Sequence, residues 1–164
     1  MTAKLQPKNS ASITFSMGLP AAGKSTYINT NYDLNKFQVI DPDAIKEAHP
    51  DYDPKNPAAL HAWSQEETEK LWNAALLAGT GNYIVDGTGT NAEKMVRRIN
   101  EARNAGYSIE LIYVTCSLET SLARNAARAR NVPEHIIKEK AQNIETAFEL
   151  IAPYADNVEI IDNN

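Results

Sequence analysis

Eight consecutive residues, Gly18 to Ser25, have the types and spacing needed to hold phosphate groups. They read Gly-Leu-Pro-Ala-Ala-Gly-Lys-Ser and match the pattern G-x-x-x-x-G-K-[ST] in full. In such a loop Gly18 and Gly23 let the backbone curl, so that successive N–H groups point at one anion. We expect Lys24 to reach the outer phosphates and the Ser25 hydroxyl to contact a Mg²⁺ ion that bridges them. The pattern therefore predicts binding of a nucleoside triphosphate.

The residues that flank this loop favour a phosphate-binding loop over a glycine-rich turn that arose by chance. Residues 12–17 alternate apolar and polar side chains, which is typical of a strand. Residues 24–30 are compatible with a helix, whose positive dipole end would face the anion. The expected nucleotide-binding residues are Gly18, Leu19, Pro20, Ala21, Ala22, Gly23, Lys24, Ser25, Thr26 and Arg124.

Two aspartates that follow predicted strands are candidates for the chemistry of a phosphate acceptor. Asp43 comes shortly after the second predicted strand and could accept the proton of an acceptor hydroxyl. The spacing supports a structural role equally well, because Asp41 or Asp43 could cap the helix that contains Lys46. Asp86 ends an apolar strand, where a carboxylate is costly unless it meets a metal ion or a hydrogen-bond donor. We therefore expect Asp86 to hold Mg²⁺ or to orient the acceptor.

Three arginines precede the helix that is predicted to start near Pro133. Arg124 and Arg128 are four residues apart, a spacing at which like charges repel unless an anion lies between them. Arg130 follows in the loop. A solvated basic surface is the alternative interpretation. We expect instead a lid over residues 124–133 that closes on phosphates.

The composition is that of an ordinary globular domain with an acidic balance. Of the 164 residues 43% are hydrophobic and 23% are charged, and the net charge is −5. This charge argues against tight, sequence-blind binding of a long duplex, although the basic residues between 124 and 140 could form a local patch. No apolar run approaches the roughly eighteen residues of a membrane span, and no signal peptide is evident. We expect a cytoplasmic monomer or small homo-oligomer, with the single cysteine, Cys116, as a packed thiol.

Short apolar segments alternate with helical stretches along the chain. The expected strands are residues 12–17, 37–41, 83–86, 109–114 and 158–161, and the clearest helical stripes lie in residues 58–78, 92–102 and 137–151. This alternation predicts a single-domain α/β fold with a parallel sheet covered by helices on both faces. Because ligands bind at the carboxyl ends of such strands, the phosphate loop, Asp43 and Asp86 should line one crevice. The domain is expected to span residues 12–164, after a flexible segment at residues 1–11.

A proline-fixed loop at residues 49–57 is expected at the rim of this crevice. Loops in that position commonly form the wall that reads the substrate. The helix that follows opens with His61 and Trp63, whose rings could stack on a ring of the acceptor.

The order of these motifs resembles that of the P-loop kinases that group zeta toxins with bacteriophage polynucleotide 5′-kinases. The resemblance rests on the phosphate loop, on Val39-Ile40-Asp41-Pro42-Asp43, on Val85-Asp86-Gly87-Thr88-Gly89 and on the arginines before Pro133. It implies the sheet order 2-3-1-4-5, with ATP and Mg²⁺ as cofactors. It also implies that Asp43 is the base on the acceptor hydroxyl, and that Lys24, Arg128 and Arg130 stabilise the transferred charge. The expected metal ligands are Ser25 and Asp86, and the expected acceptor contacts are Lys46, Trp63, Asp86 and Thr88.

One position bears on the identity of the acceptor. Zeta toxins phosphorylate UDP-N-acetylglucosamine and carry an arginine after the Gly-Thr-Gly turn, where this chain has Thr90. The chain also resembles compact bacteriophage kinases that phosphorylate 5-hydroxymethyluracil within DNA. We therefore expect the acceptor hydroxyl to belong to a nucleic acid or a nucleotide, with a sugar nucleotide as the alternative.

Two functions of other classes are weighed against a kinase. A GTP-dependent switch is disfavoured, because Asp86-Gly87-Thr88-Gly89 satisfies D-x-x-G but no guanine-reading Asn-Lys-x-Asp follows late in the chain. A non-catalytic nucleotide-binding protein is the other alternative. Such a protein would bind ATP without releasing ADP when an acceptor is added.

Overall fold

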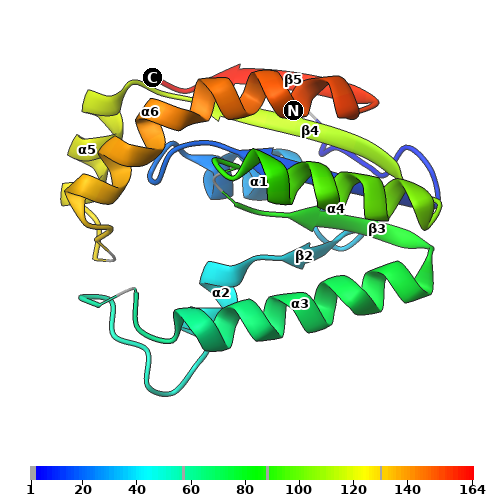
Figure 1. Ribbon diagram of the computed structural model, residues 1–164, viewed down its shortest axis with the longest axis horizontal. Coiled ribbons are helices and arrows are strands. Elements are labelled where there is room, and N and C mark those ends of the chain that lie inside the picture. The colour runs from blue at the N-terminus through cyan, green and yellow to red at the C-terminus, as the bar shows by residue number, and fades with distance from the viewer. Residues whose placement is uncertain (1–2, 57, 88, 130) are drawn as a thin grey trace.

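One parallel sheet organises the computed structural model, which describes residues 3–56, 58–87, 89–129 and 131–164 (Figure 1). Within these residues the sheet has five strands in the order β2-β3-β1-β4-β5. They are β1 (Ala11–Met17), β2 (Gln38–Ile40), β3 (Gly81–Val85), β4 (Ser108–Thr115) and β5 (Asn157–Asp162), and every neighbouring pair is parallel. The predicted fold class and strand order are confirmed.

Helices connect the strands, as parallel pairing requires. They are α1 (Lys24–Asn31), α2 (Pro42–Glu47), α3 (His61–Ala78), α4 (Ala92–Asn104), α5 (Leu118–Ala126) and α6 (Glu134–Ile151), followed by the short 3₁₀ helix η1 (Ala152–Tyr154). Among the described helices, none combines the length and the apolar composition needed to cross a bilayer.

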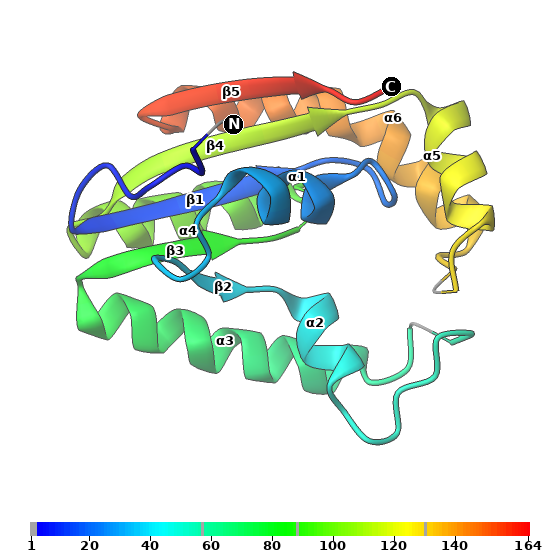
Figure 2. The same ribbon diagram turned by 180° about the vertical axis from the view of Figure 1, so that it is seen from behind.

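The alternation of side chains in β1 divides the core between the two faces of the sheet. Ile13, Phe15 and Met17 are fully buried in the larger cluster, under α3, α4 and α6. Figures 1 and 2 show α1 on the opposite face, where a smaller apolar cluster that includes Ile28 and Ile84 lies beneath it. The three central strands β1, β3 and β4 are mostly buried on both faces, as expected for a parallel sheet, whereas the edge strands β2 and β5 are largely exposed.

Most boundaries differ from the sequence prediction by one to three residues, and two of these differences have a clear local cause. β2 ends at Ile40, because Asp41 leaves the strand and caps α2. The helix expected from residue 58 begins only at His61, because Leu60 has a left-handed φ of 68° and cannot continue a right-handed helix.

Residues before β1 contact the end of α1. The Leu5 N–H donates to the Asn31 carbonyl at 2.6 Å, and the Asp33 N–H donates to the Leu5 carbonyl at 3.0 Å. The flexibility expected for residues 1–11 stays a prediction.

Candidate active site

A cavity of about 850 Å³ lies where β1, β2 and β3 end, at the carboxyl edge of the sheet. It collects residues from the phosphate loop, from the ends of β2 and β3, and from α5 and the loop after it. The predicted site residues that line it are Pro20, Ala21, Gly23, Lys24, Ser25, Thr26, Asp43, Lys46, Asp86, Arg124 and Arg128. The structure therefore brings most of the predicted nucleotide, acceptor and catalytic residues to one cavity.

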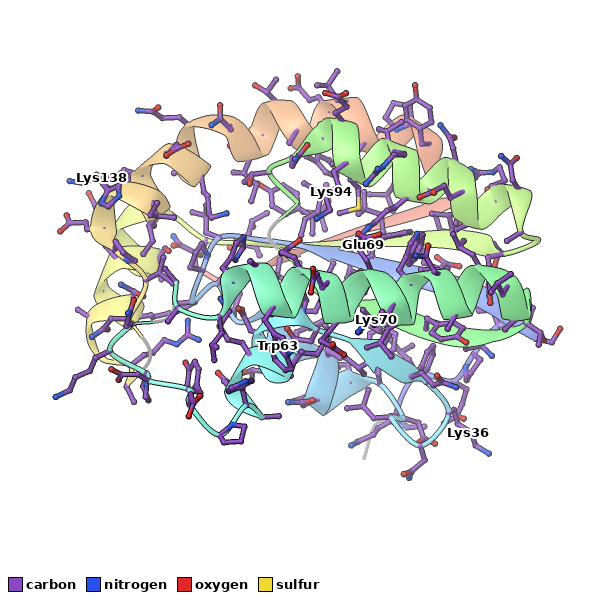
Figure 3. All side chains as sticks on the ribbon, turned by 60° about the horizontal axis from the view of Figure 1, so that its bottom comes forward. Lys36, Trp63, Glu69, Lys70, Lys94 and Lys138 are labelled. Atoms are coloured by element: carbon purple, nitrogen blue, oxygen red, sulfur yellow. The ribbon has the colours of Figure 1, made fainter. Side chains whose placement is uncertain are left out.

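Several predicted residues lie elsewhere. Gly18, Leu19 and Ala22 are buried residues of the phosphate loop itself and are not among those that line the cavity. Trp63 is not among the residues that line the cavity, and its ring packs edge-on against His49, with ring centres 4.7 Å apart. Figure 3 shows Trp63 on the side of α3 that faces α2. Thr88 and Arg130, which were predicted to contact the acceptor and the transferred phosphate, lie outside the residues that the structure describes.

The phosphate loop curls tightly before α1. Gly23 has φ 100°, a backbone conformation that favours glycine, and a Cβ there would also force the Asn163 side chain to move. Ala21 also has a left-handed φ, of 60°, which costs a non-glycine residue roughly 1–2 kcal/mol. Lys24 Nζ donates to the Gly18 and Leu19 carbonyls at 2.9 and 3.2 Å. Within the described part of the chain no side-chain cap is seen at the first turn of α1, so its backbone N–H groups can face an anion in the cavity.

Asp86 occupies a buried position beside this loop and meets two hydroxyl groups. Ser16 donates to one carboxylate oxygen at 2.6 Å, and Ser25 donates to the other at 3.4 Å. The Gly87 N–H donates in turn to the Ser16 hydroxyl at 3.3 Å, which fixes its orientation. A carboxylate and a hydroxyl side by side at a phosphate loop are oxygen ligands of the kind Mg²⁺ prefers, with phosphates and water completing its shell. Ser25 and Asp86 therefore fit the metal that the sequence implies.

The structure resolves which aspartate caps α2. The Asp41 carboxylate accepts from the Asp43 N–H at 2.9 Å, and Pro42 occupies the first turn of the helix. The Asp43 side chain is exposed and lines the cavity. Its capping alternative is thereby removed, and its role as a base remains a proposal.

Two buried polar residues of α5 fix this helix to the phosphate loop and to the segment that follows the helix. Ser121 donates to the Pro20 carbonyl at 2.6 Å. Asn125 donates to the Val132 carbonyl at 2.8 Å and accepts from the Val132 N–H at 2.9 Å, which closes the loop between them. α5 ends at Ala126, so Arg128 lies beyond the helix and not on one helical face with Arg124. Both arginines nevertheless line the same cavity.

Residues 13–151 match the AAA domain family, a span that covers most of the chain. The chain belongs to this family. Its fold is similar to that of several solved structures.

One neighbour comes from the PezAT chromosomal toxin-antitoxin system of Streptococcus pneumoniae, with a TM-score of 0.69 and 19% identity over 97% of this chain and 70% of that one. Another, the AvrRxo1-ORF1:-ORF2 complex with ATP, has a TM-score of 0.70 and 14% identity over 90% of this chain. A third, from the Pnkp1/Rnl/Hen1 RNA repair complex, has a TM-score of 0.59 and 17% identity over 90% of this chain. This chain spans 51% and 48% of the last two. At these identities the likeness is one of fold.

The segment that follows β5 reaches the phosphate loop. Asn163 donates to the Ala22 carbonyl at 2.7 Å, and Arg124 donates to the Ala22 and Asn163 carbonyls at 3.3 and 2.8 Å. Asn163 and Arg124 both line the cavity. Arg124 therefore links α5, the phosphate loop and the chain after β5.

Sequence reasoning missed four residues that position the site: Ser16, Ser121, Asn125 and Asn163. Ser16 had a detectable signal, because it is polar inside a strand with apolar neighbours and points away from Phe15 and Met17. The other three had none, since serine and asparagine are usually exposed and their buried contacts depend on tertiary packing.

Asp41 provides a pH-dependent test of the site's electrostatics. Burial raises its pKa to about 6, with Asp86 and Asp43 adding to the shift. The folded state therefore binds this proton more tightly than the unfolded state does, a contribution to stability that is present below about pH 4 and lost as pH rises through about 6. Asp41→Asn keeps a capping oxygen and removes the buried charge. We expect it to raise the free energy of unfolding at pH 7.5 by about 1–3 kcal/mol.

Urea denaturation at pH 7.5 and at pH 4 measures this effect. The gain should be largely absent at pH 4, where the wild-type carboxyl is mostly protonated. An equal gain at both pH values would mean that charge burial at Asp41 is not its cause.

Proposed function

We propose that this AAA domain is an ATP-dependent kinase that transfers the γ-phosphate to a hydroxyl of a nucleic acid or nucleotide. One observation carries the proposal: a single cavity is lined both by the phosphate-loop residues Lys24 and Ser25 and by the exposed Asp43 carboxylate. A site that only held a nucleotide would not need a carboxylate facing the phosphates. Phosphoryl transfer does need one, to orient and deprotonate the acceptor.

The side chains divide the work of the transfer. Lys24 and the start of α1 hold the outer phosphates. Ser25 and Asp86 would hold Mg²⁺, which neutralises phosphate charge when it is bound. Asp43 accepts the proton of the acceptor hydroxyl. At the same time the hydroxyl oxygen bonds to the γ-phosphorus, and the bond between this phosphorus and the oxygen that bridges it to the β-phosphate breaks, which releases ADP. Arg128, together with Arg130, compensates the charge that moves between donor and acceptor.

The preference for a nucleic acid or nucleotide acceptor rests on motif order and on one substitution. Thr90 lines the cavity at the position where a zeta toxin would have an arginine. The likeness to a structure from an RNA repair complex agrees with this preference. The likeness to a toxin-antitoxin structure favours the alternative, a sugar nucleotide such as UDP-N-acetylglucosamine.

An acceptor panel with γ-labelled ATP and Mg²⁺ tests the proposal. The panel holds DNA, DNA with 5-hydroxymethyluracil, RNA with a free 5′-hydroxyl, nucleosides, nucleotides and UDP-N-acetylglucosamine. We expect label to enter a nucleic acid or nucleotide, with one ADP released per transfer. Transfer to the sugar nucleotide alone would select the toxin-like alternative. ATP binding without transfer to any acceptor would identify a non-catalytic nucleotide-binding protein.

A nucleic-acid acceptor also predicts a steep dependence on salt. Each neutralised phosphate of a single strand contributes about 0.7 to the slope of log affinity against log salt. Contacts from Arg128 and its basic neighbours up to Lys140 should therefore make kcat/KM for the acceptor fall more steeply than ATP affinity. Steady-state kinetics and ATP titrations between about 50 and 200 mM KCl measure the two slopes. Equal slopes would contradict phosphate contacts to the acceptor.

A further inference from the structure

A second group of cations lines the cavity on the wall formed by α3 and α4. Lys94 and Arg98 lie one turn apart on the same face of α4, and both line the cavity. The other cavity-lining cations already described lie on the phosphate loop, on α2, on α5 and just after α5, so these two belong to a different element. Figure 3 shows Lys94 and Glu69 between α3 and α4. We name this part of the cavity, lined by Gln65, Lys94 and Arg98, the α3–α4 wall; Glu69 pairs with Arg98 behind it.

The buried position of Arg98 is energetically unfavourable for a charged side chain. Arg98 is only 8% exposed, and its guanidinium lies over the Trp72 ring, 5.4 Å from the ring centre. One terminal nitrogen pairs with Glu69 at 2.5 Å. The Nε group is buried and has no hydrogen-bond partner among the described residues. A buried guanidinium whose N–H donor has no partner destabilises the fold unless a further acceptor bonds to that donor.

Lys94 adds a second positive charge to this wall, and its direct hydrogen-bond partner there carries no charge. It donates to the neutral Gln65 side chain at 3.1 Å. Burial lowers the pKa of Lys94, Arg98 and Arg97 lower it further, and Glu69 opposes them. Two cations one helical turn apart repel each other, and the single carboxylate of Glu69 serves both. An anion between them would relieve that repulsion.

The starts of α3 and α4 add to the positive potential of this wall. His61 at the start of α3 and Asn91 at the cap of α4 both line the cavity. α3 begins without a side-chain cap, so its first N–H groups and its dipole favour negative charge nearby. The helix starts, the unsatisfied Arg98 and the crowded Lys94 therefore favour the same kind of ligand.

We propose that the α3–α4 wall binds a phosphate group of the acceptor through Lys94 and Arg98. This inference rests on the proposed kinase function, since it assigns the wall to the acceptor and the phosphate loop to ATP. Binding there would hold the acceptor by its own phosphate while its hydroxyl faces Asp43. A phosphodiester of a nucleic acid and the diphosphate of a sugar nucleotide share this chemistry.

Trp72 gives a direct readout, because it packs against Arg98. The chain has two tryptophans, so Trp63→Phe leaves Trp72 as the only indole. In this background, saturated with MgADP to occupy the phosphate loop, Trp72 fluorescence is titrated with thymidine, thymidine 3′-monophosphate, a thymidine dinucleotide and UDP-N-acetylglucosamine. We expect a saturable change with phosphate-bearing probes and none with thymidine. The probe with the lowest Kd tells the phosphodiester and sugar-nucleotide sources apart.

Variants of the wall should act in opposite directions. Lys94→Ala and Arg98→Lys should each raise the Kd for thymidine 3′-monophosphate by about tenfold or more, the loss of one charge-assisted hydrogen bond. Glu69→Gln should lower it about two- to five-fold, because a competing carboxylate is removed. Lys70→Ala, which removes an exposed charge from the outer side of α3, should leave it unchanged.

A purely structural role for the pair predicts a different pattern. Glu69→Gln would then weaken binding or stability together with the other two variants, and that result overturns the proposal. Equal binding of thymidine and its 3′-monophosphate would overturn it as well. Failure of the kinase proposal is distinguishable, because phosphate-dependent binding at Trp72 would persist while labelled ATP gave no transfer to any acceptor.

Discussion

Replacing Lys24 with alanine is expected to reduce phosphoryl transfer more than a hundredfold. The lysine is the charged donor of the phosphate loop, and its ammonium lies against the loop carbonyls, at the edge of the cavity. Donors of this kind contribute on the order of 3 kcal/mol or more in the transition state. Initial rates of ADP release with a saturating acceptor measure the loss, and thermal unfolding measures the fold. We expect the rate to collapse and the stability to change little.

Lys36→Ala is the matched control for this variant. Lys36 is exposed in the loop between α1 and β2, away from the residues that line the cavity. Lys36→Ala removes one positive charge, as Lys24→Ala does, so a general electrostatic effect would lower the transfer rates of both variants. Near-normal turnover of Lys24→Ala would show that the loop does not serve the transferred phosphate.

The fold was predictable because its signals are local and repeated. The strands stand out in the sequence as short apolar or alternating segments. In β1 the alternation places Ile13, Phe15 and Met17 on one face. The sheet order came from the resemblance, since spacing alone does not determine which strands are neighbours. The start of α3 was wrong by three residues, because the left-handed backbone of Leu60 has no signature in a side chain of that type.

The sequence predicted the residues of the phosphate loop more completely than those on the acceptor side of the candidate site. The phosphate loop carries a specific pattern, so its residues could be named before their positions were known. The choice between Asp41 and Asp43 as the cap could not be made from spacing, because both fit the start of α2, and only the hydrogen bond to Asp41 decides it. Lys94 and Arg98 read as ordinary charges of an amphipathic helix until tertiary packing places them on the cavity wall.

Asp43→Asn is expected to separate nucleotide binding from chemistry. The amide has the shape of the carboxylate but cannot accept the proton of the acceptor hydroxyl. The rate of transfer should therefore fall by about a hundredfold or more, while ATP affinity stays close to that of the wild type. Because Asp41 supplies the cap of α2, the substitution should leave the helix and the free energy of unfolding nearly unchanged. Single-turnover kinetics, ATP titration and urea denaturation measure the three quantities.

The contrast with a structural role is sharp, because Asp43 is exposed and its neighbour does the capping. Asp51→Asn, at an exposed aspartate that is not among the cavity-lining residues, controls for the loss of one negative charge. Wild-type turnover in Asp43→Asn would remove the base from the mechanism and leave the acceptor hydroxyl to be activated elsewhere. A large fall in rate with unchanged ATP binding and stability is the result that only a group acting on the acceptor produces.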